Sequence, residues 1–139
     1  MARVAFIKLE KAEKARYCCL LAEKHFQEGA RVLIVVEHQE QATQLDKYLW
    51  TWRKTSFVPH RLATGPGDGG AEPVVIAAGC EADFGAAILI MVRPCPVEFL
   101  RRFTVVYDFA ELYDAQLQEE SRRRYVLYRD AGLEPFMYQ

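Results

Sequence analysis

A short run of uninterrupted apolar residues is the feature that most constrains the fold of this chain. Val32–Val36 contains only branched aliphatic side chains and is flanked by Arg31 and Glu37. Alternation of apolar and polar residues indicates a strand with one solvent-exposed face. A continuous apolar run is instead typical of a strand covered on both faces, as in a parallel sheet. Ala87–Val92 has the same character. The two runs therefore predict a parallel sheet with helices on both sides.

The first part of the chain alternates between strand and helix patterns. Arg3–Leu9 predicts a strand, and Lys11–Glu28 predicts a helix that stops before Gly29, a residue suited to positive φ. The apolar stripe of this helix is expected to be Ala12, Ala15, Cys19, Ala22 and Phe26. Strand, helix, strand and helix in this order are the βαβ pattern.

The second part continues the pattern. Pro73–Ile76 is strand-like, and Phe103–Asp108 predicts the final strand. Glu111–Ala131 predicts one long charged helix that stops at Gly132. With no repeat or linker between these elements, residues 1–139 are expected to form a single three-layer α/β domain.

The composition argues against several classes of protein. A net charge of −1 gives no electrostatic support for strong direct DNA binding or for a membrane surface. No segment resembles a signal peptide or a membrane span, so we expect a cytoplasmic protein. The cysteines (Cys18, Cys19, Cys80 and Cys95) and histidines (His25, His38 and His60) are scattered. Buried reduced thiols are therefore expected, with neither a metal site nor a disulfide framework.

A glycine-rich segment, Gly65–Gly70, requires a test against nucleotide binding. A phosphate-binding loop of the Walker type needs a lysine and a hydroxyl residue that open a helix, and here a strand-like segment follows instead. The glycines also do not join a first strand to a helix, as a dinucleotide fingerprint requires. We therefore expect no cofactor. A small nucleotide-dependent enzyme on a Rossmann-like scaffold remains the alternative function, supported by fold analogy alone.

The stretch from Leu45 to His60 contains a candidate docking surface. Ala42, Leu45, Leu49 and Trp52 form one helical stripe, and Trp50 lies off that stripe. Pro59 stiffens the following loop, so Phe57 and His60 are expected to be presented on rigid backbone beside the basic pair Arg53-Lys54. Exposed aromatic residues on stiff backbone favour protein binding. The alternative is a loop in which Phe57 closes the core.

The long last helix contains a second candidate surface. Gln118, Arg122, Tyr125 and Arg129 share one face by their spacing. Two guanidinium groups beside an aromatic ring suit a ligand that carries a carboxylate next to an aromatic side chain. The alternative is an ordinary solvated face, because Glu119 and Glu120 balance the arginines.

Residues along nearly the whole chain resemble the chi subunits of bacterial DNA polymerase III holoenzyme. The most specific segments are Leu45-Asp46 with Leu49-Trp50, followed by Ser56-Phe57-Val58-Pro59-His60. Further matches are Arg31–Ile34, Glu37, Gln41-Ala42, Leu62-Ala63, Gly69–Ala71, Ile88–Ile90, Val106, Asp108-Phe109, Arg124-Tyr125, Tyr128-Arg129 and Ala131-Gly132.

The resemblance implies a Rossmann-like domain without nucleotide chemistry. It implies an accessory subunit of the clamp-loader complex that pairs with the small psi subunit and also binds the acidic C-terminal tail of single-stranded DNA-binding protein. Trp50, Phe57, Pro59 and His60 match the psi-facing motif, a surface that a helicase uses in some bacteria.

Arg122, Tyr125 and Arg129 match the helix that binds the tail, which ends in an aromatic residue with a free carboxylate. Gln118 and Val126 stand where basic residues are expected, and this difference weakens the electrostatic part of tail binding. The resemblance thus implies a non-catalytic adaptor between single-stranded DNA-binding protein and the replicative polymerase.

Overall fold

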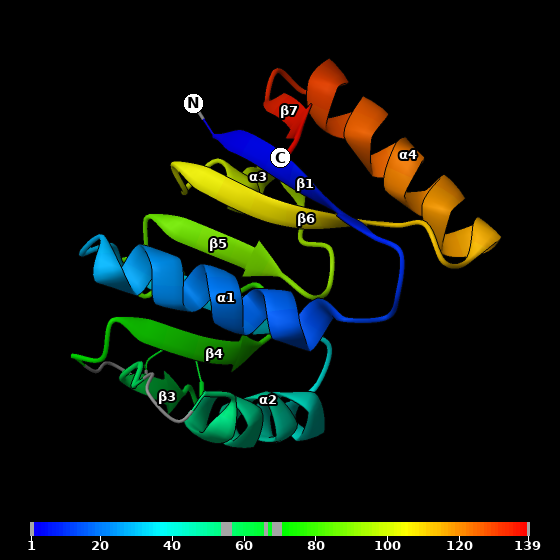
Figure 1. Ribbon diagram of the computed structural model, residues 1–139. Coiled ribbons are helices and arrows are strands. Elements are labelled where there is room, and N and C mark those ends of the chain that lie inside the picture. The colour runs from blue at the N-terminus through cyan, green and yellow to red at the C-terminus, as the bar shows by residue number, and fades with distance from the viewer. Residues whose placement is uncertain (1, 54–56, 66, 68–70, 139) are drawn as a thin grey trace.

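A single parallel sheet organises the protein. The computed structural model describes residues 2–138, except 54–56, 66 and 68–70. Its elements are β1 (Arg3–Leu9), α1 (Lys14–Gln27), β2 (Val32–Val36), α2 (Gln39–Thr51), β3 (His60–Leu62), β4 (Val74–Ala78), β5 (Ile88–Met91), α3 (Val97–Leu100), β6 (Val105–Glu111), α4 (Ala115–Asp130) and β7 (Glu134–Met137). The seven strands pair in the order β3-β4-β2-β5-β6-β1-β7, and every neighbouring pair is parallel (Figure 1).

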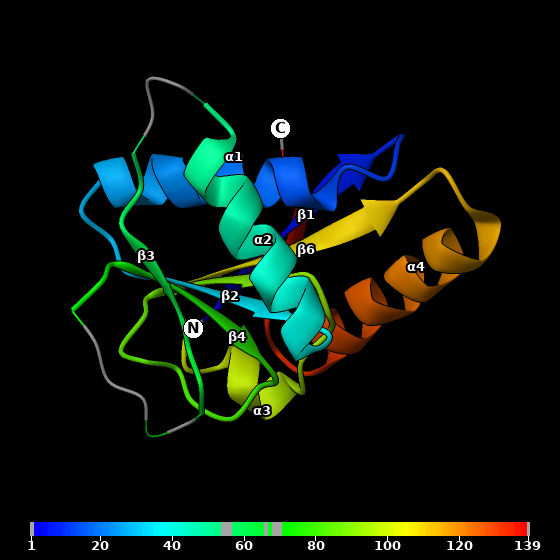
Figure 2. The same ribbon diagram turned by 90° about the horizontal axis from the view of Figure 1, so that it is seen from below.

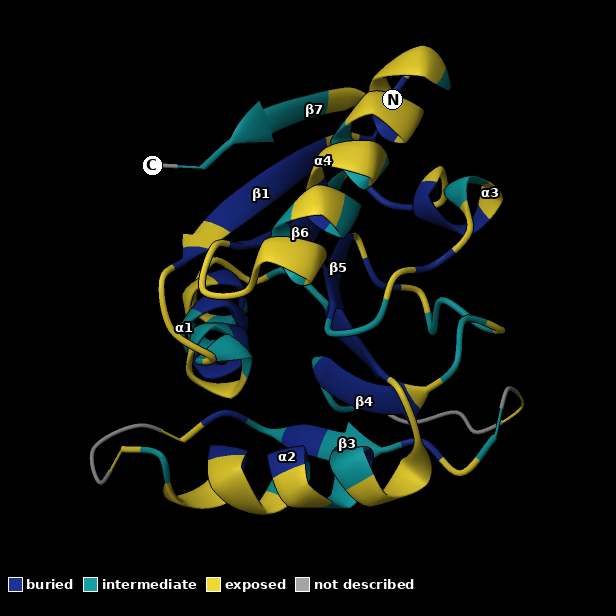
Figure 3. Ribbon diagram, turned by 90° about the vertical axis from the view of Figure 1, so that its right-hand side faces the viewer, coloured by how far each residue is buried: buried dark blue, intermediate teal, exposed yellow. Residues whose placement is uncertain are grey.

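Helices cover both faces of the sheet, which confirms the predicted three-layer α/β fold. α1 and α2 lie on one side of the sheet, and α3 and α4 lie on the other (Figure 2). The buried side chains of the strands divide accordingly into a cluster with α1 and α2 and a cluster with α3 and α4. All five residues of β2 are buried, because each face of this strand has a helical layer or its connections over it. Figure 3 shows buried strands between helices whose outer faces are exposed. The continuous apolar run therefore predicted its environment correctly.

Two short edge strands were not predicted. β7 pairs with β1, so Phe103–Asp108 does not contain the final strand of the chain. β3 pairs with β4 and is only three residues long. Pro135 and the short length of both segments hide the strand pattern, because such edges acquire strand geometry from the neighbour with which they pair.

The helix boundaries and one buried face also differ from the prediction. α1 begins at Lys14 rather than Lys11, and Ala12 and Ala15 are exposed. The residues of α1 that are buried are Cys18, Cys19, Leu21, Ala22 and His25. Hydrophobic periodicity missed His25, whose Nε2 lies 2.6 Å from the Tyr107 hydroxyl and whose pKa is lowered chiefly by burial. α4 begins at Ala115 rather than Glu111, because the side chain of Asp114 caps its first N–H groups.

The cysteines separate into two groups. Cys80 and Cys95 form a disulfide with a Cα–Cα distance of 6.0 Å, so the prediction of reduced thiols is wrong for this pair. The two residues lack a recognisable spacing because the fold brings together the loops that follow β4 and β5. Cys18 and Cys19 are free and buried, as predicted. Burial raises the pKa of Cys19 to about 12, and it raises the pKa of Cys18 as well.

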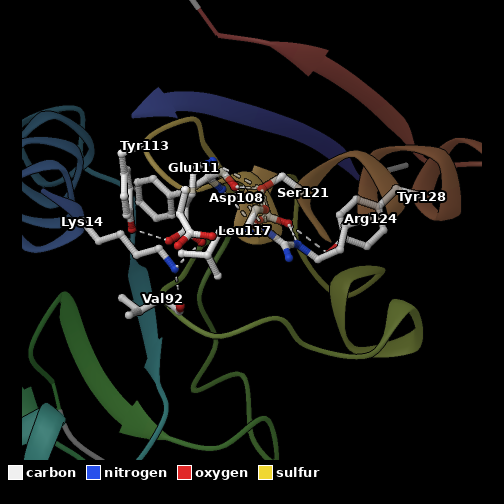
Figure 4. Close-up of polar contacts among 11 residues, drawn as sticks. Lys14, Val92, Asp108, Glu111, Tyr113, Leu117, Ser121, Arg124 and Tyr128 are labelled. Carbon is white, nitrogen blue, oxygen red and sulfur yellow. Dashed lines mark hydrogen bonds and ion pairs between the residues drawn. The ribbon is translucent and has the colours of Figure 1, made fainter. Parts of the chain in front are cut away.

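A buried ion pair attaches α4 to β6. Arg124 donates to both carboxylate oxygens of Asp108, from Nε at 2.9 Å and from Nη2 at 3.1 Å (Figure 4). The Tyr128 hydroxyl donates to the same carboxylate at 3.1 Å, and the Ser121 hydroxyl accepts from the backbone N–H of Glu111. Burial opposes the charge on Arg124, but Asp108, Tyr128 and Glu111 together outweigh this effect and raise the pKa of the guanidinium. These contacts decide which side of α4 faces solvent.

Arg124→Ala is expected to lower the free energy of unfolding by about 3–5 kcal/mol, because it leaves the Asp108 carboxylate buried without its counter-charge. Arg123→Ala is the matched control, since the side chain of Arg123 is 73% exposed and that of Arg124 only 17%. The control is expected to change stability by no more than about 0.5 kcal/mol. Urea unfolding monitored by circular dichroism measures both values. Equal effects of the two substitutions would contradict the structural role of Arg124.

Candidate functional sites: an aromatic surface and a basic helix face

The end of α2 and the segment that leads into β3 form an exposed aromatic surface. We define this aromatic surface as Trp50, Phe57 and Pro59. Trp50 is 49% exposed and Phe57 is 65% exposed, and their ring centroids lie 5.7 Å apart. Pro59, two residues after Phe57 in the chain, is half-buried. Phe57 therefore does not close the core, and the structure brings the predicted Trp50 and Phe57 together at one place.

Trp50 is exposed because of the periodicity of α2. Ala42, Leu45 and Leu49 are buried against the sheet, and the half-buried Trp52 packs on the same core cluster. Trp50 lies off this stripe, as predicted, and is about half exposed, whereas Leu49 is buried in the core.

His60 does not belong to the exposed surface, contrary to the prediction. Its side chain is fully buried at the start of β3. Both ring nitrogens have polar partners there, since Nδ1 donates to the Val58 carbonyl at 2.7 Å and Nε2 lies 3.1 Å from a carboxylate oxygen of Asp46. The imidazole ring lies 4.4 Å from the ring of Trp50. His60 thus supports Trp50 from beneath and connects α2 to β3.

Of the two basic residues predicted beside this surface, only Arg53 lies among the residues that the structure describes. Arg53 is exposed, pairs with Glu23 at 3.1 Å and stacks over the ring of Trp52 at 4.4 Å. Lys54 and Ser56 lie outside the described residues, as does most of the Gly65–Gly70 segment. Arg53 therefore contributes a charge that an acidic residue of the same protein already balances.

The second candidate surface lies on the outer side of α4. Arg122 and Arg129 are exposed on it, and Gln118 is half-buried. Arg122 lies 3.9 Å from Glu119, and Arg129 lies 3.4 Å from Asp130. The helix therefore presents both predicted arginines to solvent, each next to an acidic neighbour.

The ring of Tyr125 packs partly inside the protein, whereas a ring that binds a peptide from solvent would be exposed. It is half-buried, its ring centroid lies 5.3 Å from that of Phe6, and its hydroxyl donates to the carbonyl of Pro135 at 3.2 Å. These contacts attach α4 to β1 and β7. Only part of the Tyr125 side chain remains available on the arginine face.

Two neighbours that the prediction did not include complete this face. Arg123 and Val126 line a hollow of about 270 Å³ together with Glu119 and Arg122. Val126 is 43% exposed and Leu127 is 54% exposed. Val126 follows Arg122 by four residues, a spacing that places the two side chains together on a helix. We define the basic helix face as Arg122, Arg123, Val126 and Arg129.

The two surfaces lie on opposite edges and opposite faces of the sheet. α2 packs beside β3 and β4, whereas α4 packs beside β6 and β7 (Figure 1). The buried side chains of α2 and α4 belong to separate core clusters on the two faces of the sheet. A protein bound at one surface therefore leaves the other free.

The carboxyl edge of the sheet, where α/β proteins often bind ligands, contains an internal ion pair. Lys14 Nζ lies 3.0 Å from Glu111 and donates to the carbonyl of Val92, and the Tyr113 hydroxyl donates to Glu111 at 2.6 Å (Figure 4). The part of the chain that the structure describes contains no cluster of three or more residues that could hold a metal ion. Among the same residues, no helix combines the length and the hydrophobicity needed to cross a membrane.

Comparison with solved structures first defines the class of fold. The crystal structure of T4 UvsW matches 98% of this chain with a TM-score of 0.67, at 9% sequence identity. The match covers 40% of the UvsW chain. At this identity the similarity concerns the fold alone, which is that of a parallel α/β domain.

Comparison of sequences then identifies the family. The family of DNA polymerase III chi subunits (HolC) matches residues 1–135. The DNA polymerase III subunit chi of Escherichia coli K12 is 41% identical over 115 residues, which are 82% of this chain and 77% of the relative. The subunit chi of Pseudomonas aeruginosa is 26% identical over 135 residues, or 95% and 92% of the two chains. The chain belongs to the DNA polymerase III chi subunit family.

Trp50→Ala is expected to lower the free energy of unfolding by about 1 kcal/mol or less, because this half-exposed ring loses mainly its contacts with Phe57 and His60. Trp52→Ala is the matched control on the same helix end. It is expected to cost roughly 3 kcal/mol, because Trp52 packs on the core. Thermal and urea unfolding of both variants measure the difference. A larger loss for Trp50→Ala than for Trp52→Ala would place Trp50 in the core.

Proposed function

We propose that this chain is a non-catalytic adaptor of the DNA polymerase III clamp-loader complex, located in the cytoplasm. In this proposal the basic helix face binds the acidic C-terminal tail of single-stranded DNA-binding protein. The aromatic surface binds the psi subunit or a helicase that uses the same place. The observation that carries the proposal is the separation of the two surfaces by the sheet, because an adaptor must hold two partners at once.

The aromatic surface has the features of a protein-binding site. Tryptophan is enriched among the interface residues that contribute most to binding. Trp50 is held by the buried His60 and Phe57 is highly exposed, so a partner gains apolar contact area without reorganising the site. The residues that match the psi-facing motif are thus exposed or directly support an exposed residue.

The basic helix face suits a short acidic peptide. Guanidinium groups bind carboxylates through charge-assisted hydrogen bonds, and Arg122, Arg123 and Arg129 all point toward solvent. Val126 adds apolar area for the aromatic end of the tail. A single such contact on an exposed surface is weak, but single-stranded DNA coated with binding protein offers many tails and raises the effective affinity.

The alternative of a nucleotide-dependent enzyme receives no support from the carboxyl edge of the sheet. Lys14 begins the helix after β1, and its ammonium group is engaged by Glu111 and Val92. A phosphate-binding lysine must instead point toward the ligand. Direct DNA binding is likewise unsupported, because the net charge of −1 supplies no overall attraction for the phosphate backbone, which dominates such affinity.

Arg122→Ala is expected to weaken the binding of a tail peptide about tenfold, because a hydrogen bond to a charged group contributes roughly 1.5–3 kcal/mol. Fluorescence anisotropy with a labelled tail peptide measures the dissociation constant. Binding of the unmutated chain is also expected to weaken as salt is added. Arg53→Ala removes the same charge near the aromatic surface and is expected to leave tail binding unchanged. Equal binding by all three proteins would place the tail elsewhere.

Trp50→Ala is expected to weaken the binding of purified psi subunit about 30-fold, since truncation of a central interface tryptophan typically costs about 2 kcal/mol or more. Tyr48→Ala is the matched control, because Tyr48 is an aromatic residue of α2 that is 39% exposed and lies on another side of the helix. Biosensor binding with immobilised psi measures both. Arg122→Ala should bind psi normally, and Trp50→Ala should bind the tail normally. Loss of both activities in either variant would refute two separate sites.

A further inference from the structure

Two arginines of the basic helix face converge on one carboxylate of the protein itself. Arg122 Nη1 lies 3.9 Å from Glu119 Oε2, and Arg123 Nε lies 3.6 Å from Glu119 Oε1. The three side chains are 69%, 73% and 49% exposed, respectively, for Arg122, Arg123 and Glu119. Glu119 lies one helical turn before the two arginines, and each oxygen of its carboxylate faces a different guanidinium group.

This arrangement places an internal carboxylate in the hollow described above. Glu119, Arg122, Arg123 and Val126 line this shallow, open hollow, so it brings together two cationic groups, an apolar group and the anion with which the cations form loose ion pairs. A peptide that ends in an apolar residue with a free carboxylate carries groups that complement this lining, namely an anion for the two arginines and an apolar side chain for Val126. Glu119 therefore stands where such a carboxylate would bind.

We infer that Glu119 is a built-in competitor for the terminal carboxylate of the bound peptide. When the peptide binds, its carboxylate replaces Glu119 on Arg122 and Arg123, and its last side chain packs on Val126. The exchange is feasible because exposed ion pairs contribute little to stability and their partners separate readily. This inference rests on the proposed binding of an acidic tail by α4, and it adds the residue that limits the affinity.

The position of Tyr125 favours Val126 as the contact for the last side chain of the peptide. The ring and hydroxyl of Tyr125 are engaged with Phe6 and Pro135, whereas Val126 is open to solvent and adjoins both arginines. Val126, which stands where the family resemblance leads us to expect a basic residue, therefore replaces a charge with apolar area that the peptide can contact.

Glu119→Gln in the full chain tests the inference. It keeps the size and hydrogen-bonding shape of the side chain but removes the competing charge and its repulsion of an acidic peptide. We expect about fivefold tighter binding, the scale of one exposed ion pair. The probe is a fluorescein-labelled acidic peptide that ends in phenylalanine with a free carboxylate, measured by anisotropy at low salt.

Glu120→Gln is the matched control. It removes the same charge one residue further along α4, and in the described part of the chain Glu120 forms no ion pair with an arginine. We expect it to change the dissociation constant less than about twofold, because it alters only the long-range field. Thermal unfolding of both variants should match that of the unmutated protein.

A second peptide with an amidated C-terminus isolates the carboxylate. For this peptide, the difference between Glu119→Gln and the unmutated protein should shrink, because the group that exchanges with Glu119 is absent. Val126→Ala should weaken the binding of the free-carboxylate peptide.

The outcomes are distinguishable. Unchanged affinity in Glu119→Gln, or equal tightening in Glu119→Gln and Glu120→Gln, overturns the competition while tail binding stands. Absence of binding in all variants overturns the proposed tail site and the competition together.

Discussion

The ion pair between Arg124 and Asp108 is the interaction on which the exposed chemistry of α4 depends. Asp108 lies in the central part of the parallel sheet, and Arg124 must reach it from the helix with Tyr128 beside it. Successive residues of a helix are about 100° apart, so burial of Arg124 turns Arg122 and Arg123 toward solvent. One internal contact thereby decides which of three consecutive arginines is structural and which two are exposed to solvent.

The sequence predicted those parts of the fold in which the pattern of apolar and polar side chains alone determines which residues are buried. Continuous apolar strands such as β2, the stripe of α2 and the exposure of Trp50 follow from periodicity and burial of apolar area alone. Periodicity could not predict β7, the Cys80–Cys95 bond or the burial of His60, because each depends on a partner distant in the chain. For the same reason it could not separate Arg124 from Arg122. In the sequence, an arginine that is exposed to solvent looks the same as an arginine that pairs with a buried carboxylate, and only the folded structure shows which of them has the partner.

The two surfaces differ in physical character. On the aromatic surface, Trp50 rests on an imidazole that is itself fixed by Val58 and Asp46, so little conformational entropy remains to be lost on binding. On the basic helix face, long arginine side chains must be ordered and their ion pairs with Glu119 and Asp130 must be exchanged. The first arrangement suits a lasting subunit contact that depends weakly on salt, and the second suits a transient contact that salt weakens.

This difference fits the requirements of an adaptor at a moving replication complex. An adaptor of the kind we propose would release each tail as the polymerase advances along coated single-stranded DNA, whereas it would keep its contact with the polymerase subunits. Among closely related complexes, affinity is set mostly by the dissociation rate. In the competition that we infer, an internal carboxylate that recaptures Arg122 and Arg123 would shorten the lifetime of the tail complex without weakening the fold, because Glu119 lies on the solvent side of α4, away from the largely buried Arg124. In this proposal, the separation of the buried and exposed arginines along one helix would let tail affinity change independently of stability.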